Sequence, residues 1–535
     1  MFHFQTRIGV ASSTNIEPLA TRFTRGMRSK MRKAISILIA FITAMSLMAC
    51  GSGIVNDEVE INKGSTSTVY ASSESKAKTL LEDMGRGINM GNALDVCDWN
   101  SSGATKTIGY QVAAVYSTTP WSAWDASSYQ YFSIDGTIHF TWQIDSLNSD
   151  SGKKCNTFAI QIVSHDENAQ NKSLTCNITG ATFTSRGGQK YTLTDILGSH
   201  ELTMQNDVTE YISQSMSGFD GISTTADVIG GTLELDIELE DYYYDSATEI
   251  AKLETSWGNP QLSEEMIRAI SEKGFKTVRL PVTYFNYMSS DGTIEEAFLD
   301  RVEQVVDWII KYDMYCLISI QHDTGNDGWI KASADNYAQN HEIVEYMIKQ
   351  IAERFNSKGD HLILEGFNEM VNDNNDWGNI PISDLAIMNK WNQLFVDTVR
   401  ATGGNNANRY LLVNTYAALP STEVINGFSL PNDTADDKLL VGIHCYFKSD
   451  KLAEQFAAIK SFSDKYNVVI GEWAFWVTGE EDNRAAYATE YLQYADEYGI
   501  PAIWWDNGKT SEMALFDRNS LTWPYEELAQ AILGE

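Results

Sequence analysis

From residue 251 onward, short apolar runs alternate with amphipathic stretches, and this alternation constrains the fold more than any other feature of the chain. The runs are nearly continuously apolar, as expected for parallel strands that are covered on both faces. They are Lys276–Val282, Tyr315–Gln321, His361–Glu369, Arg409–Tyr416, Leu439–Tyr446, Asn467–Trp473 and Pro501–Asp506. An eighth run, Gly85–Leu94, lies far upstream. Eight such units favour a closed (β/α)8 TIM barrel of the α/β class over an open sheet.

The stretches between these runs have the spacing of helices. In Ser263–Lys273, the apolar residues Met266, Ile267 and Ile270 share one face of a helix. Ser263 is a good N-cap residue, and the following Gly274 is typical of a helix end.

Residues 100–250 show a different periodicity, in which apolar and polar residues alternate with a period of two. The alternating apolar positions are Ile138, Phe140, Trp142 and Ile144, and later Leu233, Leu235, Ile237 and Leu239. Half-buried antiparallel strands have this pattern, so the segment is predicted to be an all-β sandwich inserted after the first barrel strand. The barrel then occupies residues 76–99 plus 251–535.

The first 49 residues have the pattern of a secretory signal. A basic patch with Arg28, Lys30 and Lys33 precedes an apolar run of 16 residues, Ala34 to Ala49, which is shorter than the roughly 20 residues of a membrane span. The run ends in Leu-Met-Ala-Cys-Gly, which resembles a bacterial lipobox with Cys50 as the lipidated residue. The alternative is an uncleaved signal anchor. Residues before Met27 or Met31 are compatible with a mis-assigned start.

This leader predicts a secreted protein, lipid-anchored to the bacterial cell surface, or to the outer membrane if the cell is Gram-negative. Residues 50–75 are rich in Gly, Ser, Thr and Asn and are predicted to form a flexible tether. The membrane is then reached only through the lipid on Cys50. We expect a monomer.

The charge of the chain limits its partners. Lys and Arg number 39 against 72 Asp and Glu, a net charge of −33, which excludes nucleic acid as an expected partner. Cys155 and Cys176 are 21 residues apart in the β-rich segment, where a disulfide can form. Cys316 and Cys445 lie in apolar runs and are predicted to be buried thiols. No CxxC pair or His/Cys cluster indicates a metal site.

Polar residues stand where the predicted barrel strands end, which is where barrel enzymes carry their catalytic groups. They are Arg279, Gln321-His322, Asn368-Glu369, His444, Tyr446, Glu472 and Trp505. Glu369 and Glu472, on the fourth and seventh strands, are expected to face each other across the mouth. Opposed carboxylates suit cleavage of a glycosidic bond, in which one protonates the leaving oxygen and the other attacks the anomeric carbon.

This set of residues resembles glycoside hydrolase family 5, which contains many bacterial endoglucanases. The segments Gly87-Ile-Asn-Met-Gly-Asn92, Trp257-Gly-Asn-Pro260 and Trp504-Trp-Asp-Asn-Gly508 resemble its subfamily 4, whose members act on cellulose, mixed-linkage β-glucan and xyloglucan. The resemblance spans the barrel and implies a retaining endo-β-1,4-glucanase that needs no cofactor and no metal.

The resemblance also implies roles for individual residues. Glu369 is then the acid/base and Glu472 the nucleophile, and Asn368 contacts the sugar 2-hydroxyl. Arg279 and Tyr446 would orient Glu472, and His322 and His444 would lie beside the sugar. Trp505 would form the aromatic floor under the sugar, and Trp257 would contact substrate from a loop. Many relatives carry His-His where this chain has Gln321-His322. Strand alternation allows only one of Trp504 and Trp505 to face the sugar.

Loop and insert aromatics are further candidates for sugar platforms. Trp257, Trp329 and Trp377 can stack on sugars or cap the barrel. The insert is predicted to be a carbohydrate-binding domain with Trp121, Trp124, Tyr129, Tyr131 and Trp142 as candidate platforms, although its aromatics can equally fill the sandwich core, the reading favoured for Trp142.

The alternatives for the whole chain are a xyloglucanase or mannanase of the same family, or a non-catalytic surface glycan-binding protein. The presence of both Glu369 and Glu472 argues against the last of these, because a binder needs neither.

Overall fold

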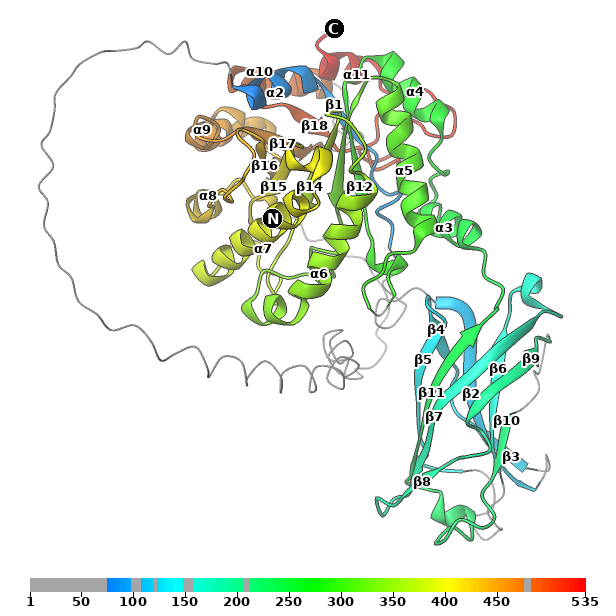
Figure 1. Cartoon of the computed structure of the whole chain (residues 1–535). Coiled ribbons are helices and arrows are strands. Elements are labelled where there is room, and N and C mark those ends of the chain that lie inside the picture. Colours follow the sequence, from blue (N-terminus) through cyan, green and yellow to red (C-terminus); the bar gives the residue numbers. More distant parts are fainter. Residues whose placement is uncertain are drawn as a thin grey trace, which may run out of the picture.

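The computed structural model describes residues 75–97, 107–119, 123–147, 157–205, 212–289, 291–475 and 483–535. Eight parallel strands close into a barrel in the order β1-β12-β13-β14-β15-β16-β17-β18, which confirms the predicted fold (Figure 1). Their bounds are β1 Gly87–Asn89, β12 Thr277–Val282, β13 Tyr315–Ile320, β14 Leu362–Phe367, β15 Leu411–Asn414, β16 Leu439–His444, β17 Val468–Trp473 and β18 Ala502–Trp504. Each strand lies within its predicted run.

Helices surround this barrel (Figure 1). They are α2 Lys76–Met84, α3 Ser246–Glu254, α4 Glu264–Lys273, α5 Glu296–Lys311, α6 Ala334–Arg354, α7 Ile382–Ala401, α8 Thr422–Gly427, α9 Leu452–Ser463, α10 Arg484–Glu497 and α11 Glu526–Leu533. Helix α4 begins and ends as predicted, because the Ser263 hydroxyl accepts from the Met266 amide and Gly274 adopts a φ of 116°.

Helix α2 closes the end of the barrel from which the strands start. Its residues Leu80 and Met84 share an apolar cluster with inward-facing strand residues such as Leu317, Leu412 and Val469. Because this end is filled with apolar side chains, only the opposite end, where the strands finish, is left for polar chemistry.

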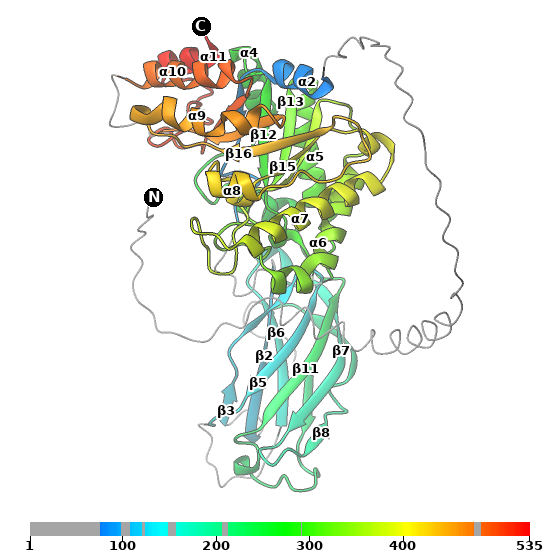
Figure 2. The same cartoon turned by 90° about the vertical axis from the view of Figure 1, so that its left-hand side faces the viewer.

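Between β1 and β12 the chain forms two five-stranded sheets of antiparallel strands. One contains β2 Thr107–Thr119, β3 Ala123–Ala126, β4 Gln130–Ser133, β6 Thr157–Ser164 and β10 Ile212–Ser215, and the other contains β5 Thr137–Gln143, β7 Ser173–Thr184, β8 Lys190–Thr192, β9 Gly198–Thr203 and β11 Thr232–Glu240. Both sheets contribute to one apolar core that is separate from the barrel core. Figures 1 and 2 show these strands as an elongated body beside the barrel.

The predicted boundary between insert and barrel is wrong by a few residues. Helix α3 begins at Ser246 rather than after residue 250, and its Ile250 packs into the barrel core. The helix contacts α5 and therefore belongs to the barrel. Its start is marked by Asp245, whose side chain accepts from the Thr248 amide as an N-cap.

The cysteines are placed mostly as predicted. Cys316 and Cys445 are fully buried thiols, and Cys176 is a buried free thiol in β7. Cys155, the predicted partner of Cys176, lies outside the described residues, as do Cys50, the signal and nearly all of the tether. Within the described ranges, no helix has both the length and the apolar character needed to span a membrane.

Candidate active site

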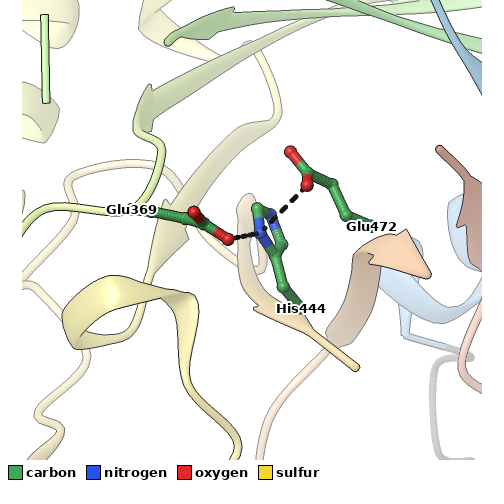
Figure 3. Close-up of side chains that lie close together, drawn as sticks. All are labelled: Glu369, His444 and Glu472. Atoms are coloured by element: carbon green, nitrogen blue, oxygen red, sulfur yellow. Dashed lines mark hydrogen bonds and ion pairs between the residues drawn. The ribbon is translucent and has the colours of Figure 1, made fainter. Parts of the chain in front are cut away.

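Two glutamates meet at the end of the barrel where the strands finish. Glu369 lies two residues after the end of β14, and Glu472 is the penultimate residue of β17. His444, the last residue of β16, lies between them: its Nδ1 is 2.7 Å from Glu369 Oε1 and 3.5 Å from Glu472 Oε2 (Figure 3). One carboxylate oxygen of Glu369 lies within 4.8 Å of one of Glu472. The two acids therefore face the same small space.

Arg279 lies beneath this pair and is completely buried. Its Nη1 donates to Glu472 Oε1 at 2.8 Å, and its Nη2 donates to the Asn368 side-chain oxygen at 2.8 Å. Because the Asn368 oxygen is engaged by Arg279, its amide nitrogen is left to point elsewhere. A single guanidinium thus fixes both Glu472 and Asn368 through a rigid fork of donors.

Glu365 is the second anion on Arg279 and was not predicted. It accepts from Arg279 Nε at 2.7 Å and Nη2 at 2.6 Å, and it is 1% exposed. Ser319 and Asn414 also donate to it, at 3.2 and 2.9 Å. A glutamate inside the otherwise apolar strand β14 is itself a sequence signal, because a buried charge needs a partner.

The surroundings of Glu472 favour its ionised form. Burial alone would raise the pKa of this carboxyl, but the charges of His444 and Arg279 and the hydrogen bond from Tyr446 outweigh burial and lower the pKa. The Tyr446 hydroxyl donates to Glu472 Oε2 at 2.8 Å. Gln321 adds a longer contact, with its Nε2 3.4 Å from Glu472 Oε1. Glu472 is therefore an anion with both oxygens engaged.

Glu369 is more accessible than Glu472. Its side chain is 27% exposed against 6% for Glu472, and both line an open pocket of about 390 Å³. Other predicted residues that line this pocket are Trp257, His322, Asn368, Tyr446 and Trp505. Arg279 and His444 do not line it, and both side chains are buried.

His322 has a buried carboxylate behind it. Its Nε2 is 3.6 Å from Oδ2 of Asp95, which is completely buried. Burial alone would lower the pKa of the imidazole, but the negative charge of Asp95, together with those of Glu472 and Glu369, outweighs burial and raises the pKa. Asp95 follows the first barrel strand in a loop, and its role was not predicted.

The choice between the two neighbouring tryptophans is settled by geometry. Trp505 lines the pocket, whereas Trp504 is completely buried and donates its Nε1 to the Met513 carbonyl at 2.8 Å. A Cβ on Gly91 would come within 2.7 Å of the Trp505 ring. Only glycine at position 91 lets the ring take this place.

The three loop tryptophans also divide into residues that line the pocket and a residue that is packed against the barrel. Trp257 and Trp377 are exposed and line the pocket. Trp329 donates its Nε1 to the buried Asp323 at 2.8 Å and packs against the barrel core, so it is a structural cap.

Glu369, His444 and Glu472 are close enough together to hold a metal ion. However, both oxygens of Glu472 already accept hydrogen bonds from Arg279 and Tyr446. The guanidinium supplies the positive charge that a metal would bring, and the arrangement suits acid–base chemistry between carboxylates.

A pair of carboxylates in an aromatic-lined pocket at the mouth of a (β/α)8 barrel defines the protein as a glycoside hydrolase. Residues 242–511 match the family model described as Cellulase (glycosyl hydrolase family 5). The chain belongs to this family.

The chain is also similar in sequence to known cellulases and endoglucanases. The chain is 34% identical over 312 residues to cellulase/esterase CelE of Acetivibrio thermocellus, covering 53% of this chain but only 38% of CelE. It is 33% identical to endoglucanase B of Clostridium cellulovorans, covering 52% of this chain and 70% of that protein.

Solved structures of family 5 glycoside hydrolases are also similar to this chain. PbGH5A, a family 5 enzyme from Prevotella bryantii B14, superposes with a TM-score of 0.50 at 30% identity, over 53% of this chain and 89% of its own. A GH5-4 broad specificity endoglucanase from Ruminococcus champanellensis with bound cellotriose superposes with a TM-score of 0.50 at 36% identity, over 53% and 89%.

Proposed function

We propose that the protein is a retaining endo-β-1,4-glucanase that uses Glu472 as nucleophile and Glu369 as acid/base. The observation that carries this proposal is the approach of the two carboxylates, whose nearest oxygens lie within 4.8 Å. Retaining glycosidases hold their carboxyl groups roughly 5–5.5 Å apart, whereas inverting enzymes need roughly 6.5–9.5 Å to admit a water. The spacing favours direct attack by a carboxylate.

In the first step, a Glu472 oxygen forms a bond to the anomeric carbon while the bond to the leaving oxygen breaks. Glu369 gives its proton to that oxygen. In the second step, water attacks the glycosyl-enzyme, Glu369 takes a proton from the water, and Glu472 leaves as a carboxylate. Arg279 and Tyr446 hold Glu472 in its ionised form throughout the free-enzyme state.

The pocket supports binding of a neutral sugar. The Trp505 ring offers an apolar surface to a pyranose face, and the Asn368 amide nitrogen can donate to the 2-hydroxyl, where hydrogen bonds strengthen in the transition state. His322 lines the pocket beside Gln321, so the Gln321 side chain takes the place of the second histidine found in many relatives.

We infer that cellulose, mixed-linkage glucan and xyloglucan are the substrates. The R. champanellensis enzyme carries bound cellotriose, and a variant of PbGH5A was solved with a xyloglucan tetradecasaccharide. A xyloglucan preference is therefore the second candidate. A mannan preference has weaker support, from the name of a P. bryantii protein that joins endo-β-mannanase and endo-β-glucanase activities.

The test is a panel of carboxymethylcellulose, mixed-linkage β-glucan, xyloglucan and mannan. We expect wild type to hydrolyse the glucans and to release products whose anomeric NMR signal is initially of the β form. Glu369→Ala and Glu472→Ala should each lose most activity, and azide should rescue them with opposite product configurations. An initial α product would refute the retaining mechanism, and a chain inert on every polymer would be a glycan-binding protein instead.

We further propose that Cys50 is lipidated, that the mature protein is a monomer, and that the lipid anchors it on the outer face of a bacterial membrane. The support is the basic patch, the apolar run and the Leu-Met-Ala-Cys-Gly sequence. Radiolabelled palmitate should enter the wild-type protein in cells but not the Cys50→Ser variant. Equal labelling of the two proteins would refute the anchor.

A further inference from the structure

One sheet of the insert is buried on both of its faces. Along β6, every residue from Phe158 to Ser164 is buried, and along β2 the same holds from Tyr110 to Ser117. Sandwich sheets usually bury one face and leave the other solvated, with alternating exposure. The outer face of this sheet therefore differs from an ordinary solvated surface.

The strand register defines which residues form this outer face. Tyr110, Val112 and Ala114 point into the sandwich core, so Gln111 and Ala113 point outward. In the register of β2 and β6, Gln111 lies opposite Val163, Ala113 opposite Gln161, and Val115 opposite Ala159. The centre of the face is thus built from small apolar side chains and two amides, and none of these residues is charged.

The outer face of the opposite sheet shows the ordinary pattern. There β11 turns Leu233, Leu235, Ile237 and Leu239 inward, and it turns four acidic residues outward. These are Glu234, Asp236, Glu238 and Glu240, of which the last three are exposed. The same insert therefore has one acidic, solvated face and one uncharged face, although residues 101–250 carry 19 acidic against 6 basic side chains.

Two exposed tyrosines border the uncharged face. Tyr131 on β4 lies opposite Gln111 in the register and is 53% exposed. Tyr129 is 46% exposed, and its hydroxyl donates to the Gln161 side-chain oxygen at 3.2 Å. Tyr131 is thus paired with Gln111, and Tyr129 contacts Gln161, which lies opposite the small residue Ala113.

Gln111 contributes an amide to this face. The residue is 8% exposed, and within the described ranges no side-chain hydrogen bond engages its amide, whose atoms are not among the fully enclosed polar atoms that lack a partner. The amide is therefore open to a hydroxyl group of a ligand, to which it can both donate and accept.

We propose that the face formed by Gln111, Tyr129, Tyr131 and Gln161, here called the tyrosine–glutamine face, binds a neutral β-glucan chain. Tyrosine rings provide flat apolar surfaces for pyranose rings, and amides can both donate to and accept from sugar hydroxyls. The excess of acidic residues in the insert disfavours anionic polysaccharides. The choice of β-glucan rests on the proposed function, since the chain to be held is the one to be cut.

The position of the insert makes such a site useful. The last described residue before the insert, Cys97, lines the pocket, and the chain returns from the insert at α3 of the barrel. Two attachment points restrict its movement more than a single linker, and a polymer held there has a raised effective concentration at the pocket.

The experiment uses the full chain with Glu472→Ala, so that polymer is bound but not consumed. Affinity electrophoresis in native gels with mixed-linkage β-glucan compares this parent with the added pair Tyr129→Ala and Tyr131→Ala, and separately with Gln111→Leu, which keeps the volume but removes the amide. Tyr346→Ala is the matched control, since Tyr346 is 41% exposed on α6 of the barrel. Thermal unfolding checks that every variant is folded.

We expect the paired tyrosine change to weaken binding about tenfold, the loss of two stacking contacts, and Gln111→Leu to weaken it about threefold. Tyr346→Ala should bind like the parent, and polygalacturonate should not retard any of the proteins. Equal retardation of the parent, the tyrosine pair and Gln111→Leu would overturn the proposal. Hydrolysis of the glucans by wild type is measured separately. If wild type hydrolyses none of them while the substitutions still weaken polymer binding, the proposed function is refuted and the tyrosine–glutamine face remains supported.

Discussion

Replacing Tyr446 by Phe tests how the nucleophile is kept ionised. The change removes one hydroxyl, which donates to Glu472 Oε2 at 2.8 Å, and leaves the ring in place. Hydrogen bonds to charged groups contribute about 1.5–3 kcal/mol, and one pKa unit corresponds to about 1.4 kcal/mol. Tyr446 is 43% exposed, so water can replace part of the bond, and we expect the pKa of Glu472 to rise by about one unit.

The sign of the effect on activity follows from the role of Glu472. Its folded-state pKa is lowered, so the attacking carboxylate is present above that pKa and is lost as the pH falls through it. A higher pKa in Tyr446→Phe moves the acid limb of kcat/KM to higher pH by about one unit. The displacement of this acid limb between wild type and Tyr446→Phe is the quantity to be measured.

A matched control is available on the outside of the barrel. The Tyr312 hydroxyl donates to Glu264 Oε1 at 2.9 Å, so Tyr312→Phe breaks the same kind of bond far from the pocket. We expect its pH profile to equal that of wild type. If Tyr446→Phe lowers kcat at all pH values without moving the acid limb, the hydroxyl does not tune Glu472 and the reasoning fails.

Two other substitutions test the buried cluster and the aromatic floor. Glu365→Gln removes a carboxylate that is paired with Arg279 and should cost about 3–5 kcal/mol of unfolding free energy, measured by denaturant titration. Glu526→Gln is the control, because its partner lysine is near the surface, and it should cost less than about 1 kcal/mol of unfolding free energy. Equal losses of unfolding free energy in the two variants would contradict the assignment of Glu365 as the buried partner of Arg279. Gly91→Ala places a Cβ 2.7 Å from the Trp505 ring and should lower kcat/KM by up to about 100-fold through displacement of the ring. An unchanged kcat/KM on glucan would show that Trp505 does not support the sugar.

The barrel could be predicted from the sequence because strands buried on both faces must be apolar throughout, and eight such runs leave few alternatives. The two glutamates followed from their positions at the ends of strands. The start of α3 was missed because residues 242–245 are aromatic and acidic, and the helix depends on the Asp245 cap more than on an apolar pattern.

Side-chain partners across the barrel were harder to predict. Glu365 and Arg279 lie on non-adjacent strands, 86 positions apart in the chain. The alternation of residues along one strand shows which side chains point into the barrel, but it does not show at what height they lie relative to the side chains of another strand. The orientation of Trp504 was also open because β17 and β18 pair with an irregular register. That irregularity leaves Trp504 packed edge-on against Trp473, with ring centroids 4.9 Å apart.

The buried cluster of Arg279, Glu365 and Glu472 has an uneven number of charges. One guanidinium is shared by two carboxylates, so the resting trio has a formal charge of −1. In the proposed mechanism, bond formation to the sugar removes the charge of Glu472, and the trio becomes neutral at the moment the glycosyl-enzyme exists. These three side chains therefore favour positive charge at the anomeric carbon, and their electrostatic attraction for it is lost once the covalent bond is made. The trio regains its formal charge of −1 only when water hydrolyses the glycosyl-enzyme and Glu472 becomes a carboxylate again.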